Sequence, residues 1–126
     1  MRFGYSANLL PPGLIIPLRI RPLDTDKTRE SWGKIDTGAD GTVIPEGIKK
    51  DLCLKPRGCQ RCWGAFDVTP KTRPTYYITV LIGEELSFDL QVISDERETV
   101  LIGRDLLNQI ILHADGPSLF FELSQA

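Results

Sequence analysis

The chain has 126 residues, which is enough for one compact domain and too few for two. Its formal net charge is −2 and no run of basic residues occurs, so neither nucleic acid nor an anionic membrane is an expected partner. No apolar run is long enough to span a membrane, and the N-terminus lacks the apolar core of a signal peptide. A cytoplasmic location is therefore the default expectation.

The first half of the chain predicts short strands. Residues 1–13 are a candidate N-terminal arm. The strands predicted after it cover residues 14–20, 31–35 and 42–44. Pro17 lacks a backbone N–H and makes the first of them an edge strand or a bent strand. Pro45 ends the third, and residues 46–52 favour a helical turn.

The second half begins with a different segment. Residues 56–74 are punctuated by glycine and proline, which predicts a long surface excursion or hairpin. A hairpin with alternating apolar residues follows, turning at Gly83 and Glu84. Later elements are predicted at residues 100–102, 106–109, 110–113 and 119–123. Many short strands and frequent turns predict a single all-β domain over residues 1–126, a small closed or folded barrel with one short C-terminal helix.

One pentapeptide, Asp36-Thr37-Gly38-Ala39-Asp40, places a carboxylate at a turn between two predicted strands. Hydrolysis of peptides by aspartates needs two adjacent carboxylates that share one proton. The ionised carboxylate takes a proton from water, and the protonated one donates to the scissile carbonyl. The sequence holds no second Asp-Thr/Ser-Gly, so the simplest solution is a two-fold dimer that brings together Asp36 from each copy.

Two segments resemble the signatures of the retropepsins, the retrovirus-type aspartic proteases. Residues 36–44 resemble their active-site segment. Residues 100–107 resemble their second signature, in which two apolar residues precede Gly-Arg-Asp/Asn and a short helix. The order is the same, with the flap-like segment 56–74 between them, and the resemblance extends over roughly residues 14–123. It implies a barrel of the acid-protease type and an aspartic endopeptidase that acts as a homodimer on peptide or protein substrates, with no metal or cofactor.

The resemblance also implies residue roles. Asp36 would be catalytic, Thr37 would bond across the dimer axis, and Gly38 would supply backbone groups beside the carboxylate. The residues implied in substrate binding are Ala39, Asp40, Trp63, Gly64, Ala65 and Phe66. The residues implied in structural support are Gly103, Arg104 and Asp105, with Arg104 paired to Asp40 and Asp105 also able to cap a helix. Apolar residues near Val43 and Ile102 would help line the cleft.

Other interpretations stay open. The pair Cys59 and Cys62 has the spacing of half a zinc site, although two reduced thiols are the simpler interpretation. His113, in a predicted strand, fits a core or edge position better than a catalytic base. Residues 24–28 match the D-x-D-x-T pattern of haloacid-dehalogenase-like phosphatases, but a polar turn between strands fits this chain better. The flap is not glycine-rich and apolar as in the family, which supports one rival function, a non-catalytic dimerisation or peptide-binding module.

Overall fold

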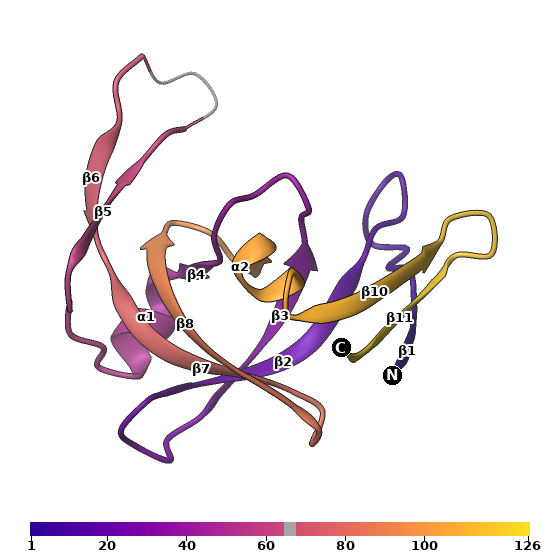
Figure 1. The fold of residues 1–126 in the computed structure, drawn as a ribbon, viewed down its shortest axis with the longest axis horizontal. Helices are drawn as coiled ribbons and strands as arrows, with labels where there is room; N and C mark the ends of the chain where they lie inside the picture. The colour runs from indigo at the N-terminus through magenta and orange to yellow at the C-terminus, as the bar shows by residue number, and fades with distance from the viewer. Residues whose placement is uncertain (65–67) are drawn as a thin grey trace.

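A computed structural model of the chain describes residues 1–64 and 68–126. In this part of the chain, six strands close a barrel in the order β2-β3-β9-β4-β8-β7 (Figure 1). These strands are β2 (Ile15–Pro22), β3 (Arg29–Ile35), β4 (Val43–Pro45), β7 (Tyr76–Ile82), β8 (Leu86–Asp95) and β9 (Val100–Ile102). The predicted all-β barrel is confirmed.

Alternating side chains build the core of the barrel. Along β8, every second residue from Leu86 to Ser94 is buried, and the residues between them are exposed or half-buried. Gly33 on β3 lies where a side chain would not fit, because a Cβ there would come within 2.5 Å of Leu18 Cδ2 and 2.7 Å of Ile102 Cδ1. Large neighbours thus fill the space above Gly33, just before β3 enters the candidate site.

The position of Pro17 explains how proline fits within β2. The strand pairs with β3 from Ile15 to Ile20, but with β7 only from Arg19 to Pro22. Pro17 therefore lies in a stretch paired on one side only, where its missing N–H removes no ladder bond to β7. The strand is interior to the sheet, yet Pro17 itself has the edge environment that the sequence predicted.

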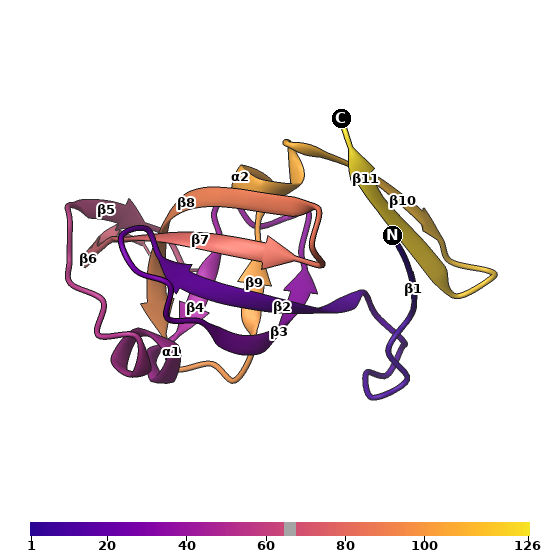
Figure 2. The ribbon, with the colours of Figure 1, turned by 90° about the horizontal axis from the view of Figure 1, so that it is seen from below.

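Two smaller sheets extend from the barrel (Figures 1 and 2). The flap hairpin, described for residues 59–64 and 68–74, is built by β5 (Cys59–Cys62) and β6 (Lys71–Pro74). A three-stranded sheet has the order β1-β11-β10. Its strands are β1 (Arg2–Gly4), β10 (Ile110–Asp115) and β11 (Phe120–Gln125). The candidate N-terminal arm thus supplies β1. The central strand of this sheet is β11, which pairs with β1 on one side and with β10 on the other.

Two short helices occur in the described residues, α1 (Glu46–Asp51) and α2 (Arg104–Leu107). The helical turn predicted after Pro45 is α1, which buries Ile48 against the core. The predicted C-terminal helix begins two residues earlier than expected, at Arg104, and buries Leu106 and Leu107. No helix in residues 1–64 or 68–126 has both the length and the apolar character needed to cross a membrane.

Helix α1 is tied to β8 through a carboxylate. The Lys49 ammonium lies 2.8 Å from Glu46 Oε2, and the Ser94 hydroxyl donates to Glu46 Oε1 over 2.8 Å. These two hydrogen bonds lower the pKa of Glu46 below its ordinary value of 4.5, and the bond from Lys49 has the larger effect. A carboxyl group whose pKa is lower in the folded state than in the unfolded state stabilises the fold at pH values above its unfolded-state pKa. This contribution is lost as the pH falls through the folded-state pKa.

Replacing Glu46 with glutamine is therefore expected to cost about 0.2–1 kcal/mol of unfolding free energy at pH 7 and less than that at pH 3. Urea unfolding of both proteins at the two pH values measures this difference. Glu96→Gln, an exposed acid on the β8–β9 connection, is the matched control and should show little effect at either pH. A loss for Glu46→Gln that is equally large at pH 3 would contradict the assignment.

Candidate active site

The Asp36 loop, residues 36–42, links β3 to β4. The Asp36 N–H donates to the Ile102 carbonyl on β9 over 3.0 Å, which fixes the start of the loop to the barrel. The loop then folds back on its own carboxylate, because the Gly38 N–H donates to Asp36 Oδ1 over 2.9 Å. The Ala39 N–H also donates to the Asp36 carbonyl, over 3.2 Å. The half-buried carboxylate is thus oriented by the backbone of its own loop.

Arg104 holds this loop from the side of α2. Its backbone N–H donates to the Ala39 carbonyl over 2.9 Å, and its Nη1 donates to the Thr37 carbonyl over 2.8 Å. Its Nη2 forms an ion pair with Asp40 Oδ1, the pair expected from the sequence. One planar guanidinium therefore binds both arms of the loop, a task that suits arginine better than lysine.

A second clamp, around Thr42, was not predicted. Asp105 accepts two bonds from this residue: the Thr42 hydroxyl donates to Oδ1 over 2.7 Å and the Thr42 N–H donates to Oδ2 over 3.1 Å. The Gly103 N–H in turn donates to the Thr42 hydroxyl over 3.2 Å. Gly103 precedes α2 as its N-cap, so Asp105, for which capping was the alternative role, lies inside the helix. Its Oδ1 also accepts the Leu106 N–H over 2.9 Å. Its main contact beyond α2 is the end of the Asp36 loop.

Replacing Thr42 with valine keeps the shape of the side chain and removes the hydroxyl. The change leaves the buried Gly103 N–H without its acceptor and takes one donor from Asp105, so we expect a loss of about 1–3 kcal/mol in unfolding free energy. Thr42→Ser keeps the hydroxyl and should retain most of the stability. Denaturant unfolding of the three proteins at one concentration measures both effects, and equal losses for valine and serine would argue against the hydroxyl clamp.

A cleft of about 310 Å³ separates the Asp36 loop from the flap hairpin. Its floor is apolar and continuous, because Val43 pairs with Ile93 on β8 and with Leu101 on β9. Leu101, and not Ile102, supplies the β9 side chain, since alternation turns Ile102 into the core, where it is 1% exposed. The flap side of the cleft is lined by Gln60, Arg61, Cys62 and Trp63.

The remaining flap residues are placed less fully. Trp63 is 63% exposed and lines the cleft as expected, and the neighbouring Gly64 is exposed two residues beyond the end of β5. The expected substrate contacts of Ala65 and Phe66 lie outside the described residues.

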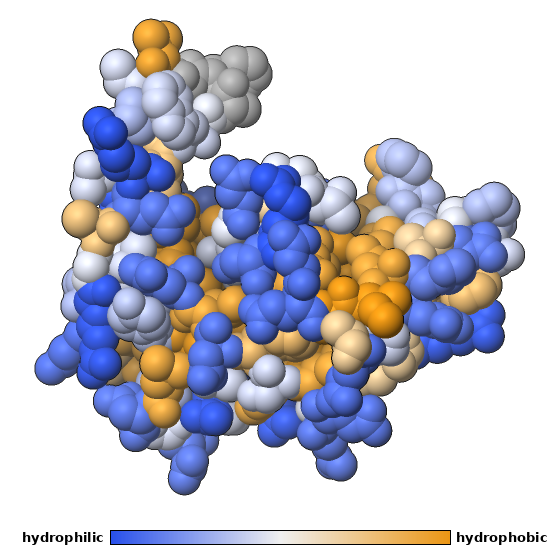
Figure 3. Space-filling model, viewed as in Figure 1, coloured by the Kyte–Doolittle hydropathy of each residue, from blue (hydrophilic) through white to orange (hydrophobic). Residues whose placement is uncertain are grey.

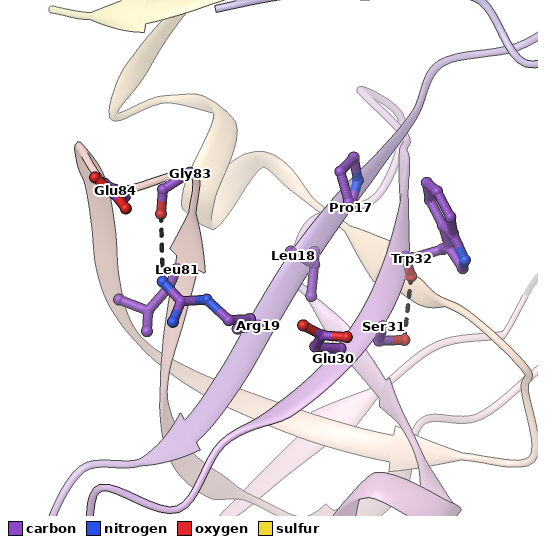
Figure 4. A pocket seen from close by; sticks show the side chains of 9 residues that line it. All are labelled: Pro17, Leu18, Arg19, Glu30, Ser31, Trp32, Leu81, Gly83 and Glu84. Carbon is purple, nitrogen blue, oxygen red and sulfur yellow. Dashed lines mark hydrogen bonds between the residues drawn. The ribbon is translucent and has the colours of Figure 1, made fainter.

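A larger hollow, of about 650 Å³, lies on the outer face of β2 and β3 (Figure 4). Its wall includes Trp32, which is 57% exposed. Arg19 turns away from Glu30 in this hollow, and its Nη2 donates to the Gly83 carbonyl over 3.5 Å (Figure 4). None of the residues lining it belongs to the Asp36 loop. This hollow is larger than the cleft, but the candidate active site is the smaller cleft, because the Asp36 loop lines that one.

Solved structures of aspartic proteases share this arrangement of strands. A retropepsin-like aspartic protease from Rickettsia conorii aligns with a TM-score of 0.66 at 12% identity, over 98% of this chain and 88% of that one. The EIAV protease, solved with the inhibitor HBY-793, aligns with a TM-score of 0.55 at 17% identity, over 84% of this chain and 92% of that one. The chain has the retropepsin fold. No protein-family model matches the chain, and no curated protein sequence matches it.

The foamy viral protease–reverse transcriptase, solved with an RNA/DNA hybrid, also contains this fold. It aligns with a TM-score of 0.53 at 22% identity over 75% of this chain. The aligned region is only 12% of the much longer viral chain. At these identities the likeness concerns the fold alone. The Asp36 loop and the flap hairpin line one cleft, and α2 holds the loop from outside it. The contact expected of Thr37 across a dimer axis stays a prediction.

Three other sequence features take ordinary positions in the retropepsin fold. Cys59 and Cys62 lie on β5, where residues three apart are about 10 Å apart and point to opposite faces, so they suit neither a mutual disulfide nor one shared metal ion. Residues 24–28 connect β2 to β3, as the turn interpretation predicted. His113 is exposed on β10, an outer strand of the three-stranded sheet, so of the two predicted positions, core or edge, it has the edge position.

Proposed function

We propose that this chain is an aspartic endopeptidase that acts as a homodimer, with one Asp36 from each subunit in a shared site. The observation that carries the proposal is the Asp36 loop, whose carboxylate is oriented by Gly38 and whose two arms are bound by Arg104 within a retropepsin fold. The substrates would be peptides or proteins bound in an extended form between this loop and the flap hairpin.

The proposed chemistry needs only the two carboxylates and a water molecule. Two carboxyl groups a few ångströms apart share a single proton, because ionising both of them would place two negative charges side by side. The ionised carboxylate takes a proton from the water as it attacks the scissile carbonyl, and the protonated carboxylate donates to the carbonyl oxygen. Collapse of the resulting diol breaks the C–N bond, with a proton passing to the amine.

The surface around the Asp36 loop offers support for a dimer. Apolar surface lies between the loop and the start of β10 in Figure 3. Partly buried apolar residues nearby in the chain are Ile35, at the end of β3, and Ile110 and Leu112 on β10. The terminal strand β11 does not have a free edge for pairing with a second copy in the described residues, because it has β1 on one side and β10 on the other. The outer edges of β1 and β10 are therefore better candidates for intermolecular strand pairing.

Cleavage of a peptide library from pH 3 to pH 8, with the mass of the protein measured at the same concentration, tests the proposal. We expect cleavage by a dimer and none by its Asp36→Asn variant. A dimer that cleaves no peptide at any pH would support the rival function, a dimerisation or peptide-binding module. A strictly monomeric protein without activity would contradict both. The cytoplasmic location stays a prediction from the sequence.

A further inference from the structure

Positive charge is concentrated on the flap hairpin and the four residues leading into it. Residues 55–74 carry five cations and one carboxylate, a net charge of +4, although the whole chain has a net charge of −2. The rest of the chain therefore carries −6. The five cations are Lys55, Arg57, Arg61, Lys71 and Arg73. Of these five, Arg61 lines the cleft beside the Asp36 loop. The segment as a whole is opposite in sign to the rest of the domain.

These cations are not neutralised within the described part of the chain. The ion pairs seen there use the cations Arg2, Arg29, Lys49, Arg97 and Arg104, and none of these belongs to the flap. Arg73 donates to the Ser94 carbonyl over 3.5 Å, a contact with a neutral group that leaves its charge unbalanced. An anion that lies beneath or beside the flap would therefore meet unpaired positive charge.

The strand register distributes these charges over both faces of the hairpin. Arg61 pairs with Thr72, whereas Lys71 pairs with Cys62 and Arg73 is opposite Gln60. Register partners share a face of an antiparallel pair, so Arg61 points to one face and the other two cations to the opposite face. Both faces of the hairpin therefore carry positive charge, and Arg61 is the cation that lines the cleft.

The floor of the cleft limits where an acidic side chain can lie. Val43, Ile93 and Leu101 make the floor apolar, and the acid lining this cleft, Asp40, is held by Arg104. The Asp36 carboxylate would repel a second carboxylate placed at the scissile bond itself. Apolar substrate residues therefore fit next to the scissile bond, and acidic residues fit further along the chain, beneath the cations of the flap.

We propose that the flap hairpin selects acidic peptides, which carry apolar residues at the scissile bond and carboxylate side chains on either side of it. This inference rests on the proposed endopeptidase function. Because both the flap and the carboxylates are exposed to solvent, each ion pair should change affinity by only about 1.4- to 5-fold, and several pairs together should give a clear preference. The preference should weaken as salt increases.

Binding can be measured apart from catalysis with the Asp36→Asn protein. The probes are three labelled peptides with one apolar centre flanked on each side by two glutamates, two glutamines or two lysines. We expect the glutamate peptide to bind tightest and the lysine peptide weakest by fluorescence anisotropy, with differences that shrink in 1 M salt. Equal affinity for the three peptides, or tighter binding of a single-stranded oligonucleotide than of the glutamate peptide, would overturn the proposal.

Charge reversal locates the effect. Arg61→Glu combined with Lys71→Glu should reverse the order of the glutamate and lysine peptides, whereas Arg19→Glu, which reverses an exposed arginine on the outer face of β2, should preserve it. The same order in all three proteins would show that the flap is not the selector. Cleavage of the glutamine peptide by the unaltered protein tests the endopeptidase function separately. Cleavage without a preference for the glutamate peptide would contradict only the acidic selection. Preferential binding of the glutamate peptide without any cleavage would contradict only the endopeptidase function.

Discussion

Replacing Asp36 with asparagine is expected to lower kcat/KM for peptide hydrolysis by roughly 10²- to 10⁴-fold or more, because it removes both the general base and the general acid from a shared site. Asparagine keeps an oxygen at the Oδ1 position, so the bond from the Gly38 N–H, 2.9 Å long in the native loop, can persist. Unfolding free energy and dimer mass should therefore change little. Initial rates on a cleaved peptide, together with these two measurements, test the prediction.

The matched control is Asp24→Asn. Asp24 lies on the connection between β2 and β3, outside the Asp36 loop, and begins the D-x-D-x-T pattern. It carries the same chemical change at a position without a role in the proposed reaction, so the rate should stay within about twofold of the native rate. A large loss of hydrolysis in Asp24→Asn, or full activity in Asp36→Asn, would show that the chemistry had been assigned to the wrong carboxylate.

Replacing Gly103 with alanine is expected to be the most disruptive small change near the site. A Cβ at this position would lie 2.5 Å from the Gly41 carbonyl carbon and oxygen, which are backbone atoms of the Asp36 loop. Backbone cannot rotate away as a side chain can, so the loop or α2 must shift, at about 1–3 kcal/mol of unfolding free energy. Displacing the carboxylate by about 1 Å could also lower kcat/KM by about 10²-fold.

Gly41→Ala is the control for this substitution. The two glycines touch each other, but a Cβ built on Gly41 meets no atom within 4 Å. Its effect on unfolding free energy should therefore stay within about 0.5 kcal/mol. Denaturant unfolding at a fixed protein concentration compares the two variants. Similar losses for both would mean that the contact between the Asp36 loop and the start of α2 is not the cause.

The features that the sequence predicted well depend on neighbouring residues. Alternation along residues 86–94 identified β8 because its period matches the pleat of a strand. The Asp36 pentapeptide and the Gly103-Arg104-Asp105 segment were related through their resemblance to the two retropepsin signatures. That resemblance implied the pair between Arg104 and Asp40, and the structure contains it.

The features that could not be predicted depend on residues far apart in the chain. Thr42 and Asp105 are 63 positions apart, and nothing local in either segment indicates that a buried hydroxyl would meet that carboxylate. The choice of Leu101 over Ile102 for the cleft depends on which face of β9 the barrel buries. Likewise, β11 has no free edge because β1 returns from the other end of the chain to pair with it. All three features depend on tertiary contacts between distant segments, which no local sequence pattern specifies.

The central claim is that two copies of Asp36 share one site, and mixtures of native protein with Asp36→Asn protein test it most directly. Once subunits have exchanged at constant total concentration, a site that needs both aspartates should lose activity as the square of the native fraction. An equal mixture would then keep about one quarter of the native rate, since only one dimer in four holds two native chains. A linear loss, with about half of the rate retained, would mean that each chain works alone and would contradict the shared site.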